Sequence, residues 1–143
     1  MPQRDYILRM IEQMGVVVAE LRRRIMRGDR SGVEGELRAM ATHAGFDLTL
    51  VDVLDAESIL SLLSSSGSPE ATRVWLAAEL VYLQGLSESQ QGRKIAARDM
   101  FAKARRLFGA LDMGSTLPGL VPEANERIRE LDDLLAPPST SLE

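Results

Sequence analysis

The residues best placed to do chemistry in this sequence are arginines that gather in one short stretch. This arginine cluster consists of Arg22, Arg23, Arg24, Arg27 and Arg30. Because guanidinium groups bind phosphates and carboxylates through paired hydrogen bonds, the cluster is a candidate anion patch of a nucleic-acid-associated or regulatory protein. The competing interpretation is that these cations stabilise the C-terminal end of a helix. Since no aromatic residues interleave the arginines to stack bases, we favour the helix-end role and expect no nucleic-acid partner.

The other polar residues match no catalytic or metal-binding pattern. His43 is the only histidine, cysteine is absent, and no H-E-x-x-H or E-x-x-H motif occurs. A lone histidine needs a nucleophile, an orienting acid or further ligands before it can act as a catalytic base or hold a metal. Four glutamates on predicted helices resemble a carboxylate bundle, but such sites also use histidines three residues after a glutamate. We therefore predict a protein that is not an enzyme and that holds no metal or cofactor.

Composition and charge narrow the class of protein further. The chain has 143 residues, of which 45% are hydrophobic and 27% are charged, and its net charge is −4. These values are typical of one soluble globular domain, which we place at residues 1–136, with residues 137–143 as a C-terminal tail. The absence of cysteine fits a reducing cytosol, and the polar first residues show no secretory signal. The longest apolar run is too short to span a bilayer, so we expect a cytoplasmic protein with no membrane partner.

The elements that must position these residues are all predicted to be helices. Apolar residues recur at helical spacing over residues 3–27, 32–43, 69–90, 94–111 and 122–136, and two short helices fill the middle of the chain. Asp47 and Asp55 are candidate N-caps for the short helices, and Gly45 is a candidate helix terminator. Ser68-Pro69-Glu70 is a strong start signal for the helix that follows it. The fold class is therefore all-α, with about six or seven helices.

The stretch from 69 to 111 predicts a tetratricopeptide-like hairpin. Gly85 and Gly92 stand where that repeat favours small residues, and the second helix carries Ala97, Phe101 and Ala104. Small residues allow a neighbouring helix to approach closely, and the phenylalanine fills the space between them. Gln84 departs from the pattern, because the repeat favours leucine there. An earlier turn at Gly28 is a weaker match, so we expect one regular and one degenerate hairpin in a short α-α superhelix.

Three segments together resemble an uncharacterised bacterial family. Residues 3–13, Gln-Arg-Asp-Tyr-Ile-Leu-Arg-Met-Ile-Glu-Gln, are similar to that family's N-terminal signature, Q-x-D-Y-I-x-R-M-I-E-Q. Residues 46–63 are similar to its middle part, and the hairpin at 69–111 to its tetratricopeptide-like helices. The resemblance implies a bacterial protein with tetratricopeptide-like helices and supplies no catalytic residue.

One apolar stripe runs along the first predicted helix. It consists of Ile7, Ile11, Met14, Val18, Leu21 and Ile25, which alternate spacings of four and three as the seam of a coiled coil does. Further apolar residues beside the stripe widen this face beyond what one neighbouring helix covers. We therefore predict that this helix contributes to a homodimer. The alternative is that it is the central helix of a monomeric bundle.

These patterns favour a non-enzymatic protein-interaction or scaffold protein of unknown pathway that associates with itself. Its other partner would be an unknown cytosolic protein. Trp75 and Tyr82, seven residues apart, lie on similar faces of one predicted helix. They are candidates for a peptide-binding hot spot, although we favour a core position. The alternative function is nucleic-acid association through the arginine cluster.

Overall fold

The computed structural model describes residues 2–43, 45, 47–63, 71–111 and 121–137, and for 2–8, 10, 11, 71 and 121–123 it describes the backbone alone. The described residues form seven helices and no strand. In chain order they are α1 (Pro2–Met26), α2 (Val33–His43), α3 (Leu48–Val53), α4 (Ala56–Leu63), α5 (Ala71–Gln90), α6 (Lys94–Gly109) and α7 (Val121–Leu135). The prediction of an all-α protein is confirmed, whereas a tetratricopeptide-type superhelix stays a prediction.

The two aspartates predicted as N-caps do cap the short helices. The Asp47 carboxylate accepts a hydrogen bond from the backbone N–H of Thr49 at 2.9 Å, and that of Asp55 accepts one from Ser58 at 2.8 Å. Each bond satisfies a donor that the first turn of a helix leaves unpaired. Gly45 has a φ of 89° after the end of α2, as predicted for a terminator. The start signal at Ser68-Pro69-Glu70 lies outside the described residues.

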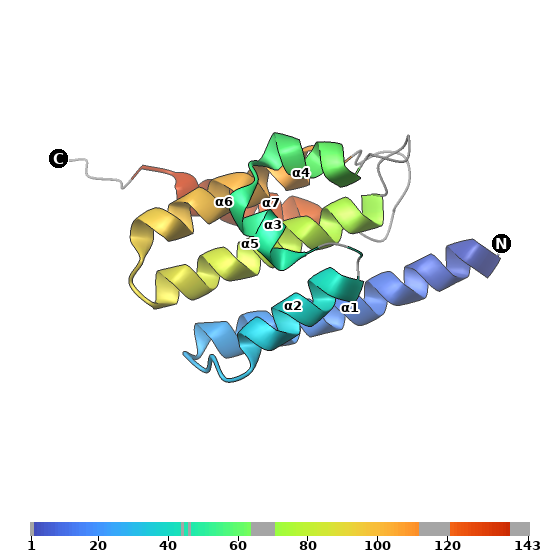
Figure 1. The fold of residues 1–143 in the computed structure, drawn as a ribbon, viewed down its shortest axis with the longest axis horizontal. Helices are drawn as coiled ribbons and strands as arrows, with labels where there is room; N and C mark the ends of the chain where they lie inside the picture. The colour runs from blue at the N-terminus through green and yellow to red at the C-terminus, as the bar shows by residue number, and fades with distance from the viewer. Residues whose placement is uncertain (1, 44, 46, 64–70, 112–120, 138–143) are drawn as a thin grey trace.

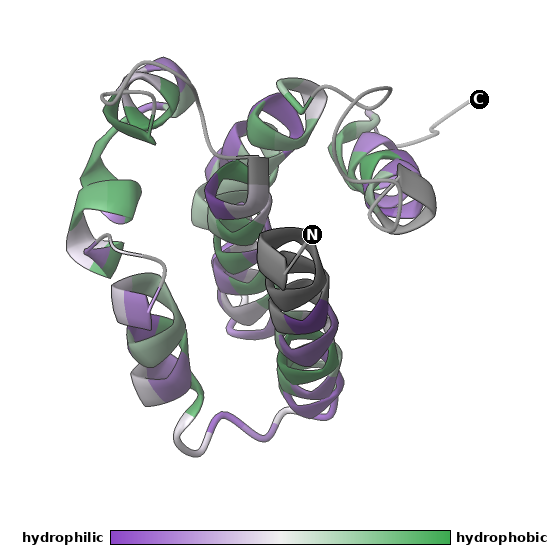
Figure 2. Cartoon of the chain, turned by 90° about the vertical axis from the view of Figure 1, so that its right-hand side faces the viewer, coloured by the Kyte–Doolittle hydropathy of each residue, from purple (hydrophilic) through white to green (hydrophobic). Residues whose placement is uncertain are grey.

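Helix α5 is the central element of the fold. Every residue from Val74 to Leu83 is buried, and α5 packs against α1, α2, α3, α4 and α6. Seen nearly end-on, α2, α3 and α4 form an arc on one side of α5, while α6 and α7 lie on the other (Figure 2). A helix that is apolar around most of its circumference needs partners on all sides, and this arrangement supplies them.

Helices α5 and α6 form an antiparallel hairpin and have the most extensive contact of the described helix pairs. Ala97, Phe101 and Ala104 of α6 are buried, as the repeat pattern predicts. A Cβ atom at Gly85 would lie 2.6 Å from Phe101 Cε1 and 2.7 Å from Phe101 Cδ1. Only glycine leaves room for the ring at this point of α5, so Gly85 fixes how closely the two helices approach.

Helix α1 runs parallel to α5 and buries one part of its apolar stripe against it. Val18, Leu21 and Ile25 are buried in the core. The shared direction follows from two contacts: Arg22 reaches Tyr82, and further along both helices Gln90 reaches Met26. The N-terminal part of α1 projects past the helices that it packs against (Figure 1).

The Gly85–Phe101 contact generates a stability prediction. Gly85→Ala should lower the free energy of unfolding by about 1–3 kcal/mol, because overpacking a core forces side chains and backbone to shift. Gly15→Ala is the matched control, since a Cβ there meets nothing within 4 Å. That variant should instead gain roughly 0.5–1 kcal/mol from helix propensity. Chemical denaturation measures both, and equal effects at the two glycines would contradict the close approach.

Candidate functional site

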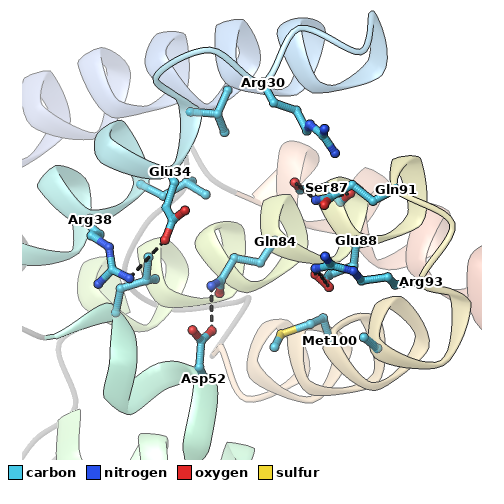
Figure 3. Close-up of a pocket in the computed structure, with 14 residues that line it drawn as sticks. Arg30, Glu34, Arg38, Asp52, Gln84, Ser87, Glu88, Gln91, Arg93 and Met100 are labelled. Atoms are coloured by element: carbon cyan, nitrogen blue, oxygen red, sulfur yellow. Dashed lines mark hydrogen bonds and ion pairs between the residues drawn. The ribbon is translucent and has the colours of Figure 1, made fainter.

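A groove of about 560 Å³ opens between α2, α3, α5 and α6. Apolar side chains contributed by α2, α3 and α6 line part of it: Val33, Leu37, Leu48, Ala96 and Met100. Its polar lining comes from three arginines, three carboxylates, two amides and one hydroxyl: Arg30, Arg38, Arg93, Glu34, Asp52, Glu88, Gln84, Gln91 and Ser87. Figure 3 shows these side chains approaching the groove from all four helices and from the α1–α2 turn. A site of this size and mixture can hold a small molecule or a short polypeptide segment.

Helix α5 contributes a polar stripe to the groove. Gln84 and Ser87 are three residues apart on one face of the helix, and Gln91 follows four residues later, directly after the helix ends, where its backbone N–H still donates to the Ser87 oxygen at 3.2 Å. The stripe begins directly after the buried run that ends at Leu83. Gln84 departs from the repeat pattern and Arg30 belongs to the arginine cluster, so the sequence marks two of the polar residues that line the groove.

The Gln84 amide is only half paired. Its Nε2 donates a hydrogen bond to Asp52 Oδ1 at 2.6 Å, whereas its Oε1 is buried and has no partner among the described residues. A buried acceptor without a donor costs about 1–3 kcal/mol. Within the described residues, the groove wall therefore carries a buried acceptor whose hydrogen bond is missing.

A lysine of α6 holds the α3 side of the groove. Lys103 Nζ donates to the backbone oxygen of Val51 at 2.7 Å and to that of Asp52 at 3.2 Å. Carbonyls at a helix C-terminus attract cations. Burial lowers the pKa of Lys103, while the nearby Asp52 carboxylate opposes that change. Asp52 is thus fixed between Gln84 of α5 and Lys103 of α6.

Two of the three arginines in the groove are already paired. Arg38 bonds Glu34 at 3.1 Å, and Arg93 bonds Glu88 at 3.0 Å. Arg30 makes no side-chain hydrogen bond or ion pair within the described part of the chain. Figure 3 shows its guanidinium group extending from the α1–α2 turn toward Ser87 of α5 and toward Gln91, which directly follows α5.

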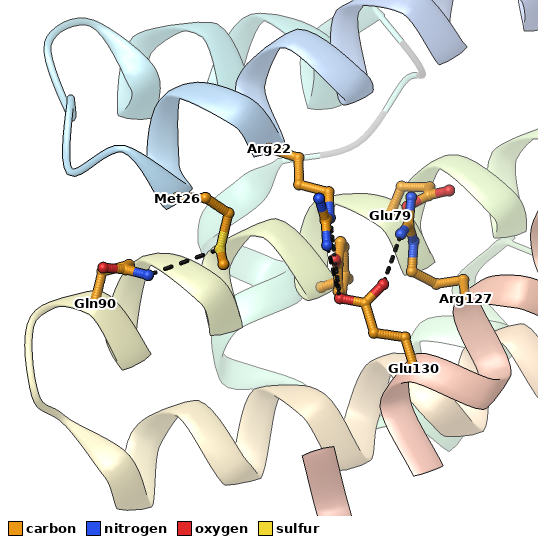
Figure 4. A network of polar contacts seen from close by, with 7 residues as sticks. Arg22, Met26, Glu79, Gln90, Arg127 and Glu130 are labelled. Atoms are coloured by element: carbon orange, nitrogen blue, oxygen red, sulfur yellow. Dashed lines mark hydrogen bonds and ion pairs between the residues drawn. The ribbon is translucent and has the colours of Figure 1, made fainter. Parts of the chain in front are cut away.

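A second polar cluster lies on a different side of α5 and joins α1 to α7 (Figure 4). Arg22 Nε donates to the Tyr82 hydroxyl at 2.6 Å, and that hydroxyl donates to Glu130 Oε2 at 2.5 Å. Burial and the bond to Glu130 raise the pKa of Tyr82. Burial alone would raise the pKa of Glu130, but the Tyr82 hydroxyl and two arginines outweigh it, so this pKa lies below the ordinary value of 4.5.

The same cluster contains a buried carboxylate. Glu79 is 3% exposed, accepts a hydrogen bond from Trp75 Nε1 at 3.2 Å and pairs with Arg127 at 3.1 Å. Arg127 also bonds Glu130 at 3.0 Å and lies 4.2 Å from the centre of the Tyr82 ring. Buried charges need such partners to be tolerated. We interpret this cluster as the clasp that holds α7 on α5.

The arginine cluster does not form one patch. Arg22 belongs to the α7 clasp, and Arg24 bonds Glu36 at 2.6 Å as well as the backbone oxygen of Ser31. Arg23 pairs with Glu20 at 3.3 Å on the surface. Arg27 is exposed, and Arg30 lines the groove. The candidate anion patch is thus divided among four environments, because Arg22 pairs with Glu130, 108 residues away, Arg24 pairs with Glu36, 12 residues away, and Arg30 turns to the groove.

The apolar stripe of α1 is divided as well. Val18, Leu21 and Ile25 belong to the core of the same chain, which corrects their assignment to an interface with a second copy. Their partner is the buried face of α5, which the stripe alone did not identify. Met14 is half-buried against this core. The side chains of Ile7 and Ile11 lie outside the described residues.

The other residues predicted as candidates for a binding or catalytic role lie in the core or at a helix end. Trp75 and Tyr82 are 2% and 0% exposed, so they are core residues and do not form a surface hot spot. His43 ends α2 on the surface. The described residues contain no group of three or more histidines, cysteines or carboxylates that could hold a metal ion.

Comparisons with protein-family models, curated proteins and solved structures found no match for this chain. The resemblance to the bacterial family therefore stays a prediction. None of the helices in the described residues is both long and apolar enough to cross a bilayer.

The half-paired amide gives a first prediction for this site. Gln84→Met should change the free energy of unfolding by less than about 1 kcal/mol, because it removes one hydrogen bond and one unpaired buried acceptor together. Asp52→Ala should cost more, since it leaves both ends of the Gln84 amide without a partner. Urea denaturation of the two variants tests the expected order, and a larger loss in Gln84→Met would contradict it.

The α7 clasp gives a prediction for pH. Because the pKa of folded Glu130 is lowered, its charge stabilises the fold above the ordinary value of 4.5. That contribution is lost as the pH falls through the lower, folded pKa. The stability difference between the parent protein and Glu130→Gln should therefore be largest near neutral pH and shrink below about 4.5. Glu126→Gln, an exposed change on the same helix, is the control and should differ from the parent by less than about 0.5 kcal/mol throughout.

Proposed function

We propose that this chain is a non-enzymatic protein-interaction module that binds a polypeptide segment in the groove between α2, α3, α5 and α6. The groove itself is the observation that carries the proposal. Its lining combines apolar side chains with arginines, carboxylates, amides and a hydroxyl, which supply both hydrogen-bond donors and hydrogen-bond acceptors. A polypeptide presents the same mixture, because each residue offers a backbone donor and a backbone acceptor.

The arrangement of the helices supports a tetratricopeptide-like interpretation. In this proposal α1–α2 is the degenerate hairpin and α5–α6 the regular one, and the groove is lined by residues of α2, α5 and α6 together with α3. Repeat proteins bind partners on the concave side of stacked hairpins. The proposed protein is a short α-α superhelix. The resemblance of residues 3–13 to a bacterial signature supports a bacterial origin, and the absence of cysteine supports a cytoplasmic setting.

We also propose that the chain forms a homodimer through α1. Val17 and Met26, which flank the stripe, are 36% and 46% exposed, and Val16 is 70% exposed. The N-terminal part of α1 projects beyond its neighbours (Figure 1), and it carries Ile7 and Ile11. A projecting helix with an apolar stripe is suited to pack against a second copy.

Nucleic-acid association has less support than protein binding. Arg22 and Arg24 are already paired with Glu130 and Glu36. Counterion release from phosphates depends on cations that are free to replace those counterions. Because the arginine cluster is divided among different environments, few of its arginines lie together on one face of the protein where they could contact phosphates.

Site-specific photo-cross-linking tests the groove. A photoreactive amino acid placed at Gln91, which is exposed and lines the groove, should form cross-links to another polypeptide in cells that express the chain. The same amino acid at Asn125, exposed on α7 and outside the groove, is the matched control. Equal cross-linking at both positions would reject the groove as the binding surface.

Light scattering at micromolar concentration tests the homodimer. The parent protein should show twice the chain mass of 15.7 kDa, and Val17→Glu should lower the mass toward that of one chain because it places a charge in the interface. Val53→Glu, at a valine of α3 that is 71% exposed, is the control and should leave the mass unchanged. A parent mass of one chain at every concentration would reject the dimer.

A further inference from the structure

We propose that the groove selects an extended peptide segment that carries an acidic side chain, and that Arg30 is the anchor for its carboxylate. This inference rests on the proposed function, and it names the chemistry of the partner.

The unpaired state of Arg30 sets the sign of the charge that the groove selects. Arg38 and Arg93 are each paired with a carboxylate of the groove. Asp52 is balanced by Lys103, which attracts it electrostatically. Arg30 is left as the lining cation without a side-chain partner within the described residues. A carboxylate brought by a ligand would complete the charge balance and could bond the guanidinium group through both oxygens.

The α1–α2 turn holds Arg30 in place for this role. Asp29 Oδ1 accepts a hydrogen bond from the backbone N–H of Ser31 at 3.2 Å, and the Arg24 guanidinium donates to the Ser31 backbone oxygen. Arg30 lies between these two anchored residues. Its backbone is therefore fixed while its side chain extends over the groove toward Ser87 and Gln91 (Figure 3), which lowers the entropy cost of binding.

The polar stripe of α5 favours an extended conformation of the ligand. Gln84 and Gln91 are two helical turns apart, which corresponds to about 10 Å along the axis. An extended chain covers that distance in about three residues. Gln91 Nε2 already donates to the Ser87 hydroxyl oxygen at 3.3 Å, so a backbone N–H of the peptide can bond Gln91 Oε1 and a backbone carbonyl can accept from the Ser87 hydroxyl. Gln84 Oε1 lacks a donor among the residues that the structure describes, so a peptide N–H that reaches it after a shift of the amide supplies a missing bond. A helical ligand would offer no free backbone groups to this stripe.

Selection from a displayed library of random heptapeptides tests the inference. The parent protein should enrich peptides that contain Asp or Glu, and Arg30→Glu should lose that preference and enrich Lys or Arg. Arg27→Glu is the matched control, because Arg27 is also exposed and near the same turn but does not line the groove. It should select the same peptides as the parent. Thermal melts of the three proteins establish that each is folded.

Fluorescence anisotropy then measures the contact itself. A selected peptide and its counterpart with Asn in place of Asp should differ in affinity for the parent by on the order of fivefold, the value of a strong exposed ion pair. The difference should disappear with Arg30→Gln, as expected for two groups that interact directly. The acidic peptide should also bind more weakly as salt is raised.

The outcomes separate the two proposals. Peptides that bind the parent without an acidic preference, or a preference that Arg27→Glu removes equally, would overturn the role of Arg30 and leave peptide binding in place. Failure of every library peptide to bind the parent would overturn both the anchor and the groove as a peptide site.

Discussion

The contact between Gly85 and the Phe101 ring sets the geometry on which the rest of the molecule depends. Without a Cβ at 85, α6 lies close to α5, and this closeness brings Met100 into the lining of the groove. It also carries Lys103 to the last carbonyls of α3. Those bonds hold Asp52 beside Gln84. The position of the α3 side of the groove therefore depends on the absence of a side chain at Gly85 of α5.

Residues 74–86 of α5 are buried apart from the half-buried Gln84, and the carboxylate and the amide in this stretch, Glu79 and Gln84, have different roles. Glu79 is paired with Arg127 and Trp75, so its charge is compensated and it holds α7 in place. Gln84, about 140° away around the helix, has an acceptor that meets no donor in the described part of the chain, and it lies in a groove. A buried polar group whose bonds are satisfied is a structural element, whereas one whose bonds are incomplete in an open groove is a candidate for ligand binding.

The arginines follow the same logic. A guanidinium group that pairs with a carboxylate of its own chain is no longer available to bind an anionic ligand. Arg22 pairs with Glu130 in this way, and Arg24 pairs with Glu36. Their neighbour Arg30 differs because it lies in the turn and not on the helix face toward α7 or α2. An arginine of this chain is available to bind a ligand only if no carboxylate of the chain already pairs with it. The residue type alone does not indicate whether such a pair exists.

The sequence by itself determined the helices, because their signals are local: apolar spacing, the Asp47 and Asp55 caps, and the terminator Gly45 each act within a few residues. It also predicted the buried Ala97, Phe101 and Ala104, and it marked Gln84 as irregular. Only the tertiary structure decided that Val18, Leu21 and Ile25 face α5 in the same chain. It likewise decided which arginines are paired, since Arg22 and Glu130 are 108 residues apart. Such pairings arise from the packing of whole helices, and the spacing of residues along the chain does not specify them.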